Sequence, residues 1–229
     1  KFFGKPCGLL DQMTSSVGSF VEIDFADPAK PVIEKLDFDF ASCGYALCIV
    51  DTGGSHSDLT DEYAAVRKEM ESVAEYLGKS VLREVDEDEF TKNIADIRSS
   101  CGDRAVLRAM HFYGDNARVE KQAAALKAGD FETFKKYIIE SGRSSYMYNQ
   151  NVYSCKKASE QPVSLALSLS EKLLDGCGAW RVHGGGFAGT IQAFVPLNKL
   201  DEYKDLMEKV FGSGSCYILS VRPVGGVEL

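Results

Sequence analysis

A run of glycines near the carboxyl end of the chain has the composition of a binding turn. Residues 184–189 read Gly-Gly-Gly-Phe-Ala-Gly and fit the spacing GxGxxG. A dinucleotide-binding turn of this spacing needs a strand before it and a helix after it, but residues 190–195 have the composition of a strand. The dinucleotide interpretation therefore fails. The run by itself favours a tight turn between two strands, where missing Cβ atoms let the backbone approach a neighbour or a phosphate closely.

A carboxylate near the start of the chain is a second candidate for chemistry. Asp11 and Gln12 follow an apolar pair at residues 9–10, in a pattern that favours the first turn of a helix. An acid there is commonly structural, because it lies near the positive end of the helix dipole. Beside a phosphate-binding turn, it has a second possible role, orienting or deprotonating a hydroxyl nucleophile. The segment alone favours the structural role.

Two further patterns predict no site. Residues 78–80 read Gly-Lys-Ser, like the end of a P-loop, but Val73 stands where the first glycine belongs and a helix precedes the segment. The three histidines, His56, His111 and His183, show no metal-binding spacing and no cysteine pair accompanies them. We therefore expect no metal site built from protein side chains.

Hydrophobic periodicity predicts the elements that position these residues. Strands are expected at 19–25, 45–50, 179–182, 190–195 and 216–221, and helices at 61–77, 104–110, 116–127, 130–138, 162–174 and 198–211. Residues 141–154 show no period and are expected to be irregular. From residue 45 this is the order of a ferredoxin-like βαββαβ fold of the α+β class, with a helical insertion after its first strand. Residues 1–40 fall outside that order, so we divide the chain into 1–40 and 41–229.

Composition excludes several classes of function. The 229 residues include 26 basic and 34 acidic side chains, for a net charge of −8, which argues against nucleic-acid and anionic-membrane partners. No apolar run approaches the roughly 20 residues of a membrane-spanning helix. The seven cysteines form no CxxC pair, which favours reduced thiols and a cytoplasmic location.

Four segments, taken together, resemble the galactokinase branch of the GHMP kinases. Residues 7–12 (CGLLDQ) are similar to that branch's CG-(I/L)-MDQ element, and residues 56–67 (HSDLTDEYAAVR) to its H-S-L-x-x-x-x-Y-x-x-R stretch. Residues 181–189 (RVHGGGFAG) resemble its R-M-T-G-G-G-F-G-G loop, and residues 123–131 (AAALKAGDF) its A-A-L-x-x-G-D-(F/Y) helix. The segments occur in the family's order. Their ordered set carries the resemblance, because each segment is weak alone.

The resemblance implies a sugar 1-kinase that transfers the γ-phosphoryl group of ATP, bound with Mg²⁺, to the anomeric hydroxyl of galactose. Asp11 would be the catalytic carboxylate, which accepts the proton of the C1 hydroxyl or orients it. Gly8 would contact the sugar through its backbone, and the hydroxyl of Tyr63 would bond a sugar oxygen. The phosphate region would be supported from the second lobe by the glycine turn: Gly184, Gly185, Gly186, Phe187 and Gly189.

Several departures from the family's pattern qualify this expectation. The segments R-x-N-L-I-G-E-H-x-D-Y and P-x-x-x-G-L-S-S-S-A are absent, so the chain resembles the C-terminal part of such an enzyme with a remnant of the N-terminal lobe. We expect no kinase activity from the chain alone, and an apolar lobe interface that promotes self-association. His183 replaces a Thr and Ala188 a Gly, and Ala188 requires a negative φ. Residues 141–160 follow the family only loosely.

Three alternatives remain open at this stage. The first is a kinase for another sugar, such as N-acetylgalactosamine. The second is a non-catalytic sensor that keeps the kinase fold to bind sugar and ATP while it regulates a partner. The third is an α/β interaction module in which the glycine turns are accidental.

Overall fold

A four-stranded antiparallel sheet forms the centre of the computed structural model, which describes residues 8–54 and 59–226. Its strand order is β4-β5-β3-β6, with β3 at Tyr45–Asp51, β4 at Ala179–Val182, β5 at Thr190–Pro196 and β6 at Cys216–Leu219. Every neighbouring pair in this sheet is antiparallel. The order confirms the predicted ferredoxin-like fold of the α+β class, which places the glycine run between β4 and β5.

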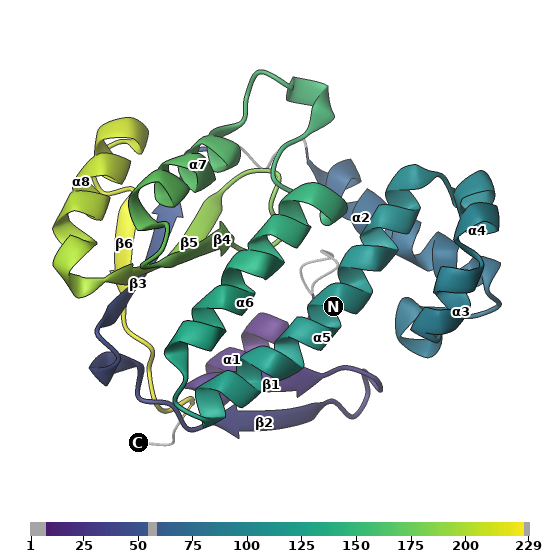
Figure 1. The fold of residues 1–229 in the computed structure, drawn as a ribbon, viewed down its shortest axis with the longest axis horizontal. Coiled ribbons are helices and arrows are strands. Elements are labelled where there is room, and N and C mark those ends of the chain that lie inside the picture. The colour runs from purple at the N-terminus through teal and green to yellow at the C-terminus, as the bar shows by residue number, and fades with distance from the viewer. Residues whose placement is uncertain (1–7, 55–58, 227–229) are drawn as a thin grey trace.

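Helices cover this sheet, and side chains of the helices and the strands together form the hydrophobic core. The helices α6 (Phe131–Ser144), α7 (Pro162–Leu174) and α8 (Leu200–Phe211) follow the expected segments and lie against the strands (Figure 1). Alternate residues of β3 are buried, as expected for a strand with one face in the core. Side chains of β3, β5, α7 and α8 share one cluster, which includes Val50, Leu174, Ile191 and Met207. The ends of β4 and β5 are therefore held rigidly.

A second group of helices is inserted between β3 and β4. It comprises α2 (Thr60–Tyr76), α3 (Glu87–Lys92), α4 (Ile94–Cys101) and α5 (Asp103–Lys127), which share a buried apolar cluster. The prediction of two helices at 104–110 and 116–127 was wrong, because α5 continues through Gly114. The guanidinium of Arg118 lies over Gly114, and packing along α2 and α6 offsets the cost of about 1 kcal/mol for a helical glycine. None of the described helices is long and apolar enough to cross a bilayer.

Residues 141–154 were expected to be irregular, which is confirmed for residues 150–154 but wrong for residues 141–149. Helix α6 continues to Ser144, and a π-helical turn occupies Ser145–Asn149. The serines that suggested a loop make contacts with polar side chains of α5. The hydroxyl of Ser141 donates to Asp115 (2.6 Å), and that of Ser144 lies 2.9 Å from Nδ1 of His111. Tertiary hydrogen bonds thus override the local preference of these side chains.

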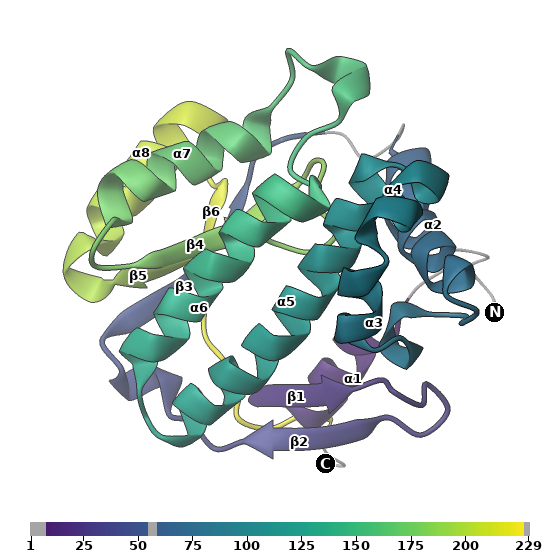
Figure 2. The ribbon, with the colours of Figure 1, turned by 45° about the vertical axis from the view of Figure 1, so that its right-hand side comes forward.

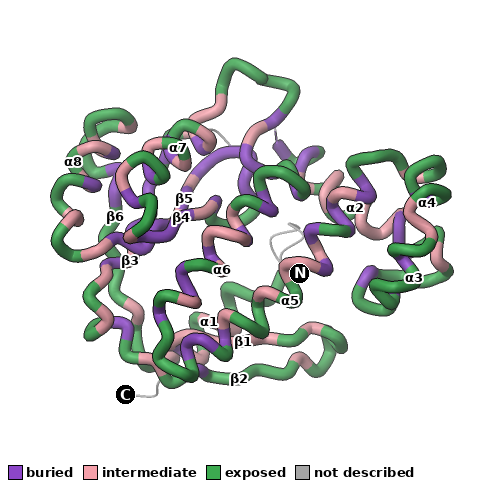
Figure 3. The backbone as a smooth tube through the Cα atoms, in the orientation of Figure 1, coloured by how far each residue is buried: buried purple, intermediate pink, exposed green. Residues whose placement is uncertain are grey.

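A helix and a two-stranded ribbon precede the central sheet. Helix α1 (Leu10–Val17) is followed by β1 (Phe20–Asp24) and β2 (Val32–Leu36), which pair antiparallel below α5 and α6 (Figure 2). Strand β2 was not predicted, and most of it is exposed (Figure 3). An aromatic cluster joins the ribbon to α6 and β5: Phe20, Phe40, Phe131, Phe134 and Phe194. The division of the chain at residue 40 stays a prediction.

Candidate active site

The glycine run forms the turn between β4 and β5. The N–H of His183 donates to the carbonyl of Thr190 at 3.0 Å, which closes the end of the hairpin. Four residues of the turn have positive φ: Gly184 (69°), Gly186 (80°), Phe187 (59°) and Gly189 (82°). Ala188 is not among them, as predicted for a residue with a Cβ. Backbone conformation therefore favours glycine at 184, 186 and 189, whereas Phe187 adopts a positive φ with a side chain.

Two side chains from distant segments hold the turn. The hydroxyl of Tyr63, on α2, donates to the carbonyl of Gly186 at 2.8 Å, and burial raises its pKa. Nδ2 of Asn151 donates to the carbonyl of Gly185 at 3.1 Å, while the carbonyl of Asn151 accepts from the N–H of Phe187 at 2.5 Å. The carbonyl groups of the turn are thus directed toward the protein.

The amide groups of the turn fall into two sets: the N–H of Phe187 donates to Asn151 and that of Ala188 to the carbonyl of Gly186, whereas the first three glycines differ. Within residues 8–54 and 59–226, no group accepts a hydrogen bond from the N–H of Gly184, Gly185 or Gly186. In a trans peptide the C=O of Gly185 and the N–H of Gly186 point in opposite directions, so the N–H of Gly186 is turned away from Asn151. Successive amides in a turn with positive φ form a concave site for anions. The N–H groups of Gly184, Gly185 and Gly186 are therefore candidate donors for an anion such as phosphate.

Asp11 lies near the start of this turn. It is exposed on the first turn of α1, and its charge opposes the effect of burial on the pKa of His183. Burial is the larger effect and lowers the pKa of His183, whose Nδ1 lies 2.9 Å from Oγ1 of Thr190. The carboxylate of α1 and the imidazole that precedes the turn therefore interact electrostatically.

The C-terminal segment fixes α1 in this position. Its backbone carbonyl at Arg222 accepts from the N–H of Ser19 at 2.7 Å, and the N–H of Gly226 donates to the carbonyl of Ser16 at 3.1 Å. A Cβ added to Gly225 would lie 1.8 Å from that same carbonyl oxygen. Because the approach is so close, the end of the chain determines where the helix of Asp11 lies.

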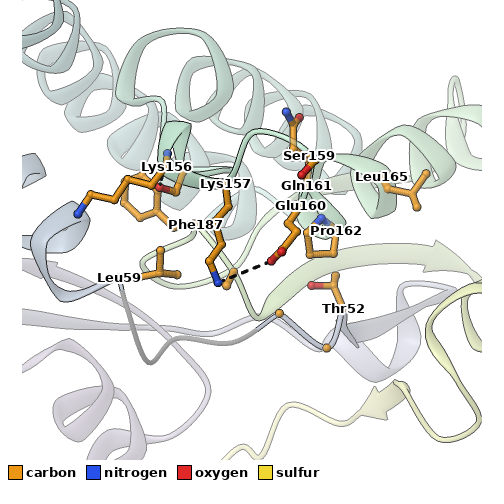
Figure 4. Close-up of a pocket in the computed structure, with 14 residues that line it drawn as sticks. Thr52, Leu59, Lys156, Lys157, Ser159, Glu160, Gln161, Pro162, Leu165 and Phe187 are labelled. Atoms are coloured by element: carbon orange, nitrogen blue, oxygen red, sulfur yellow. Dashed lines mark hydrogen bonds and ion pairs between the residues drawn. The ribbon is translucent and has the colours of Figure 1, made fainter.

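A cavity of about 830 Å³ adjoins the other side of the turn. Its lining includes residues that follow β3, residues before and at the start of α7, and one residue of the turn: Thr52, Gly54, Lys157, Pro162 and Phe187 (Figure 4). Nζ of Lys157 lies 3.9 Å from the carboxylate of Glu160 (Figure 4). This volume falls within the range of small-molecule sites.

A buried polar network supports β4 behind the turn. Burial lowers the pKa of His111, while the neighbouring carboxylate of Asp115 opposes this effect and the charges of Arg181 and Arg118 add to it. The hydroxyl of Ser141 links Asp115 to Arg181, which donates to it at 2.7 Å. The network thus ties α5 and α6 to β4, immediately before His183.

We expect this network to make the protein sensitive to acid. Because the folded pKa of His111 lies below its ordinary value near 6.5, the unfolded chain binds more protons once the pH falls below that value. The free energy of unfolding should therefore fall with pH below about 6.5. Urea unfolding at a series of pH values should show a flatter dependence for His111→Gln. An unchanged slope in this variant would contradict the assignment.

Several known proteins are similar in sequence to this chain. The chain is 30% identical over 228 residues to the galactokinase of Homo sapiens, covering 100% of this chain and 55% of that protein. It is 26% identical over 207 residues to the galactokinase of Actinobacillus pleuropneumoniae serotype 5b, covering 90% of this chain and 51% of the relative. The chain is a homologue of the galactokinases. It spans about half the length of the curated relatives it matches.

Solved structures agree on the fold of this galactokinase homologue. The structure of Lactococcus lactis galactokinase complexed with galactose matches 99% of the chain and 57% of its own length, with a TM-score of 0.71 and 21% identity. L. major mevalonate kinase in complex with R-mevalonate matches 98% of the chain with a TM-score of 0.58 and 13% identity. The chain therefore has the GHMP kinase fold. No protein-family model matches it.

The galactokinase homologue brings most of the predicted site residues to one region. Tyr63 contacts the glycine turn directly, and Asp11 influences His183 at its start, while Gly8 lies two residues before α1. Cys7 and His56, which belong to two of the matching motifs, lie outside the described residues.

Sequence reasoning missed the residues that hold the turn from behind. Asn151 lies in the segment that was expected to be irregular, and no periodic signal marks it. The buried hydroxyl of Ser154 donates to the carboxylate of Glu62 at 2.7 Å, which attaches the same segment to the first turn of α2. Polar residues in an aperiodic segment were the only available signal.

Proposed function

We propose that the chain supplies the catalytic carboxylate and one phosphate-binding turn of an ATP-dependent sugar 1-kinase that acts on galactose. The observation that carries this proposal is the glycine turn, because the N–H groups of Gly184–Gly186 have no acceptor among the described residues. Homology to galactokinases supports the same reaction class. A base and a set of amide donors are what phosphoryl transfer requires.

In the proposed reaction, Asp11 accepts the proton of the C1 hydroxyl of the sugar, or orients that hydroxyl. The sugar oxygen then forms a bond to the γ-phosphorus, and the bond from this phosphorus to the β–γ bridging oxygen breaks. ADP leaves with the electron pair of that bond. Mg²⁺ enters with ATP as part of the substrate complex, and the amides of the turn stabilise charge on the phosphate oxygens.

The remaining predicted residues have binding roles in this proposal. The backbone of Gly8 would contact the sugar near Asp11. The phenol of Tyr63 already donates to Gly186, so toward a sugar hydroxyl its oxygen would be an acceptor. The Tyr63 side chain would then contact both the sugar and the phosphate turn, and so couple the two sites. The cavity beside Phe187 has room for part of the nucleotide.

We further propose that residues 1–229 alone do not phosphorylate sugar. The family's sugar-recognition segment and its main phosphate loop have no counterpart in the sequence. In this proposal they belong to a longer protein that contains the chain, and they complete the site. Exposed apolar side chains on α1 and β2 support an interface there, among them Leu10 and Val32, and would favour self-association of the isolated chain. The composition of the cysteines supports a cytoplasmic location for the reaction.

A coupled assay for ADP across a panel of sugars tests the proposal. The longer protein should release ADP with galactose and not without sugar, while residues 1–229 alone should release none. Turnover with N-acetylgalactosamine but not galactose would transfer the proposal to another sugar. Binding of galactose and ATP without any ADP would favour a sensor and refute the catalytic proposal.

A further inference from the structure

Asn151 occupies an unusual position behind the glycine turn. It is 5% exposed, and its side chain makes one hydrogen bond, from Nδ2 to the carbonyl of Gly185. Its Oδ1 has no partner among the described residues. A buried amide with a single bond, made to the backbone of a candidate active-site turn, indicates a role in holding that turn.

The segment that carries Asn151 is itself anchored. Gln150 has a φ of 55°, which ends the π-helical turn and directs the next residue toward the glycine turn. Nε of Arg108, which is fully buried, donates to the carbonyl of Asn149 at 3.1 Å, and its NH1 lies 2.9 Å from Glu69. An ion pair on α2 and α5 therefore fixes the backbone immediately before Asn151.

The contact with the turn leaves no space between the two backbones. A Cβ added to Gly186 would lie 1.8 Å from the carbonyl oxygen of Asn151, and that oxygen accepts from the N–H of Phe187. The backbone of Asn151 therefore holds the residue after Gly186, while its side chain holds the carbonyl before it. Together they fix both peptides that flank Gly186.

We propose that Asn151 is a positioning residue for phosphoryl transfer, which orients the Gly185–Gly186 peptide so that the N–H of Gly186 faces the nucleotide phosphates. The phosphate half of this inference rests on the function proposed above. Asn151 touches neither substrate in this proposal. Its effect on the reaction passes entirely through the peptide that it holds.

Steady-state kinetics of the longer protein separate this role from simple packing. Asn151→Asp keeps the size of the side chain but removes the Nδ2 donor, and Asn151→Ala removes both. We expect each to raise the KM for MgATP about tenfold, and the KM for sugar less than about twofold. Asn149→Ala is the matched control, because Asn149 is also buried and its Oδ1 also lacks a partner among the described residues. It should leave both constants unchanged. Wild-type kinetics in Asn151→Asp, or equal changes in Asn151→Ala and Asn149→Ala, would overturn the inference.

Amide hydrogen exchange of residues 1–229 gives a readout that does not depend on catalysis. The N–H of Phe187 donates to the backbone carbonyl of Asn151, which both variants retain. Without the Nδ2 bond to Gly185 the turn should open more often and break this backbone contact, so exchange at Phe187 should accelerate about tenfold or more in Asn151→Asp and stay unchanged in Asn149→Ala. If the longer protein does not phosphorylate sugar but exchange at Phe187 is faster in Asn151→Asp, the proposed function fails and the role of Asn151 in holding the turn remains. Equal exchange in wild type and Asn151→Asp would refute the positioning role, whatever the kinetics.

Discussion

Asp11→Asn should lower the kcat for sugar phosphorylation by about 10²–10⁴-fold, the range that a positioned general base contributes. Asparagine has nearly the same shape as aspartate but cannot accept the proton of the C1 hydroxyl. Because Asp11 is exposed on the first turn of α1, the change removes no buried contact. The KM values for galactose and MgATP should therefore change by less than about threefold. Initial rates from the ADP-coupled assay, at several concentrations of each substrate, measure all three constants.

A neighbouring position on the same helix provides the control for Asp11. Ser15 is exposed and lies one turn further along α1, so Ser15→Ala should keep the wild-type kcat. A kcat within about twofold of wild type in Asp11→Asn would refute the catalytic assignment. A large loss in both variants would indicate that the position of the helix matters instead of the carboxylate.

Gly186→Ala should lower the free energy of unfolding of residues 1–229 by about 2–5 kcal/mol. The backbone of Gly186 has a φ of 80°, which costs an L-residue roughly 1–2 kcal/mol. The new methyl group would also lie 1.8 Å from the carbonyl oxygen of Asn151, so one backbone must move. Urea unfolding, followed by circular dichroism, measures the change.

Gly184→Ala separates the two causes of this loss. Gly184 has a φ of 69°, but a Cβ there would meet no atom within 4 Å. This variant should lose only the roughly 1–2 kcal/mol of backbone strain. Equal losses in the two variants would show that the close contact with Asn151 contributes nothing.

The sheet and its helices were predictable because their patterns are strong. Strand β3 is a nearly continuous run of apolar residues. Helices α2, α7 and α8 show helical periodicity with clear end signals, such as Gly78 after α2, which has a φ of 72°. Strand β2 was missed because its residues are mostly exposed and polar residues interrupt the pattern. It forms through pairing with β1, and a cross-strand partner leaves no local mark in a sequence.

The errors in the helical region have the same origin. Gly114 predicted a break, but contacts of α5 with α2 and α6 on either side keep the helix continuous. The serines and asparagines at 141–154 predicted a loop, but several of them bond to groups of α5 and of the glycine turn. A local propensity is a weak guide wherever such distant partners exist.

The candidate site was predictable in part for a comparable reason. Asp11 and the glycine turn are short motifs that each favoured a structural interpretation alone, and the ordered resemblance to the galactokinase branch indicated them as site residues. The position of the Asp11 helix depends on the C-terminal segment that packs on α1, which no motif records. Asn151 contacts the turn because the π-helical segment before it places its backbone there. Residues that act by position are visible only in three dimensions.

Identification of the product by ³¹P NMR tests the central claim most directly. The longer protein, incubated with galactose, ATP and Mg²⁺, should produce a sugar phosphate resonance that couples to the anomeric proton, together with ADP in equal amount. The Asp11→Asn variant should form this product far more slowly under the same conditions. A phosphate ester at another hydroxyl, or ADP with inorganic phosphate alone, would contradict the account of a sugar 1-kinase.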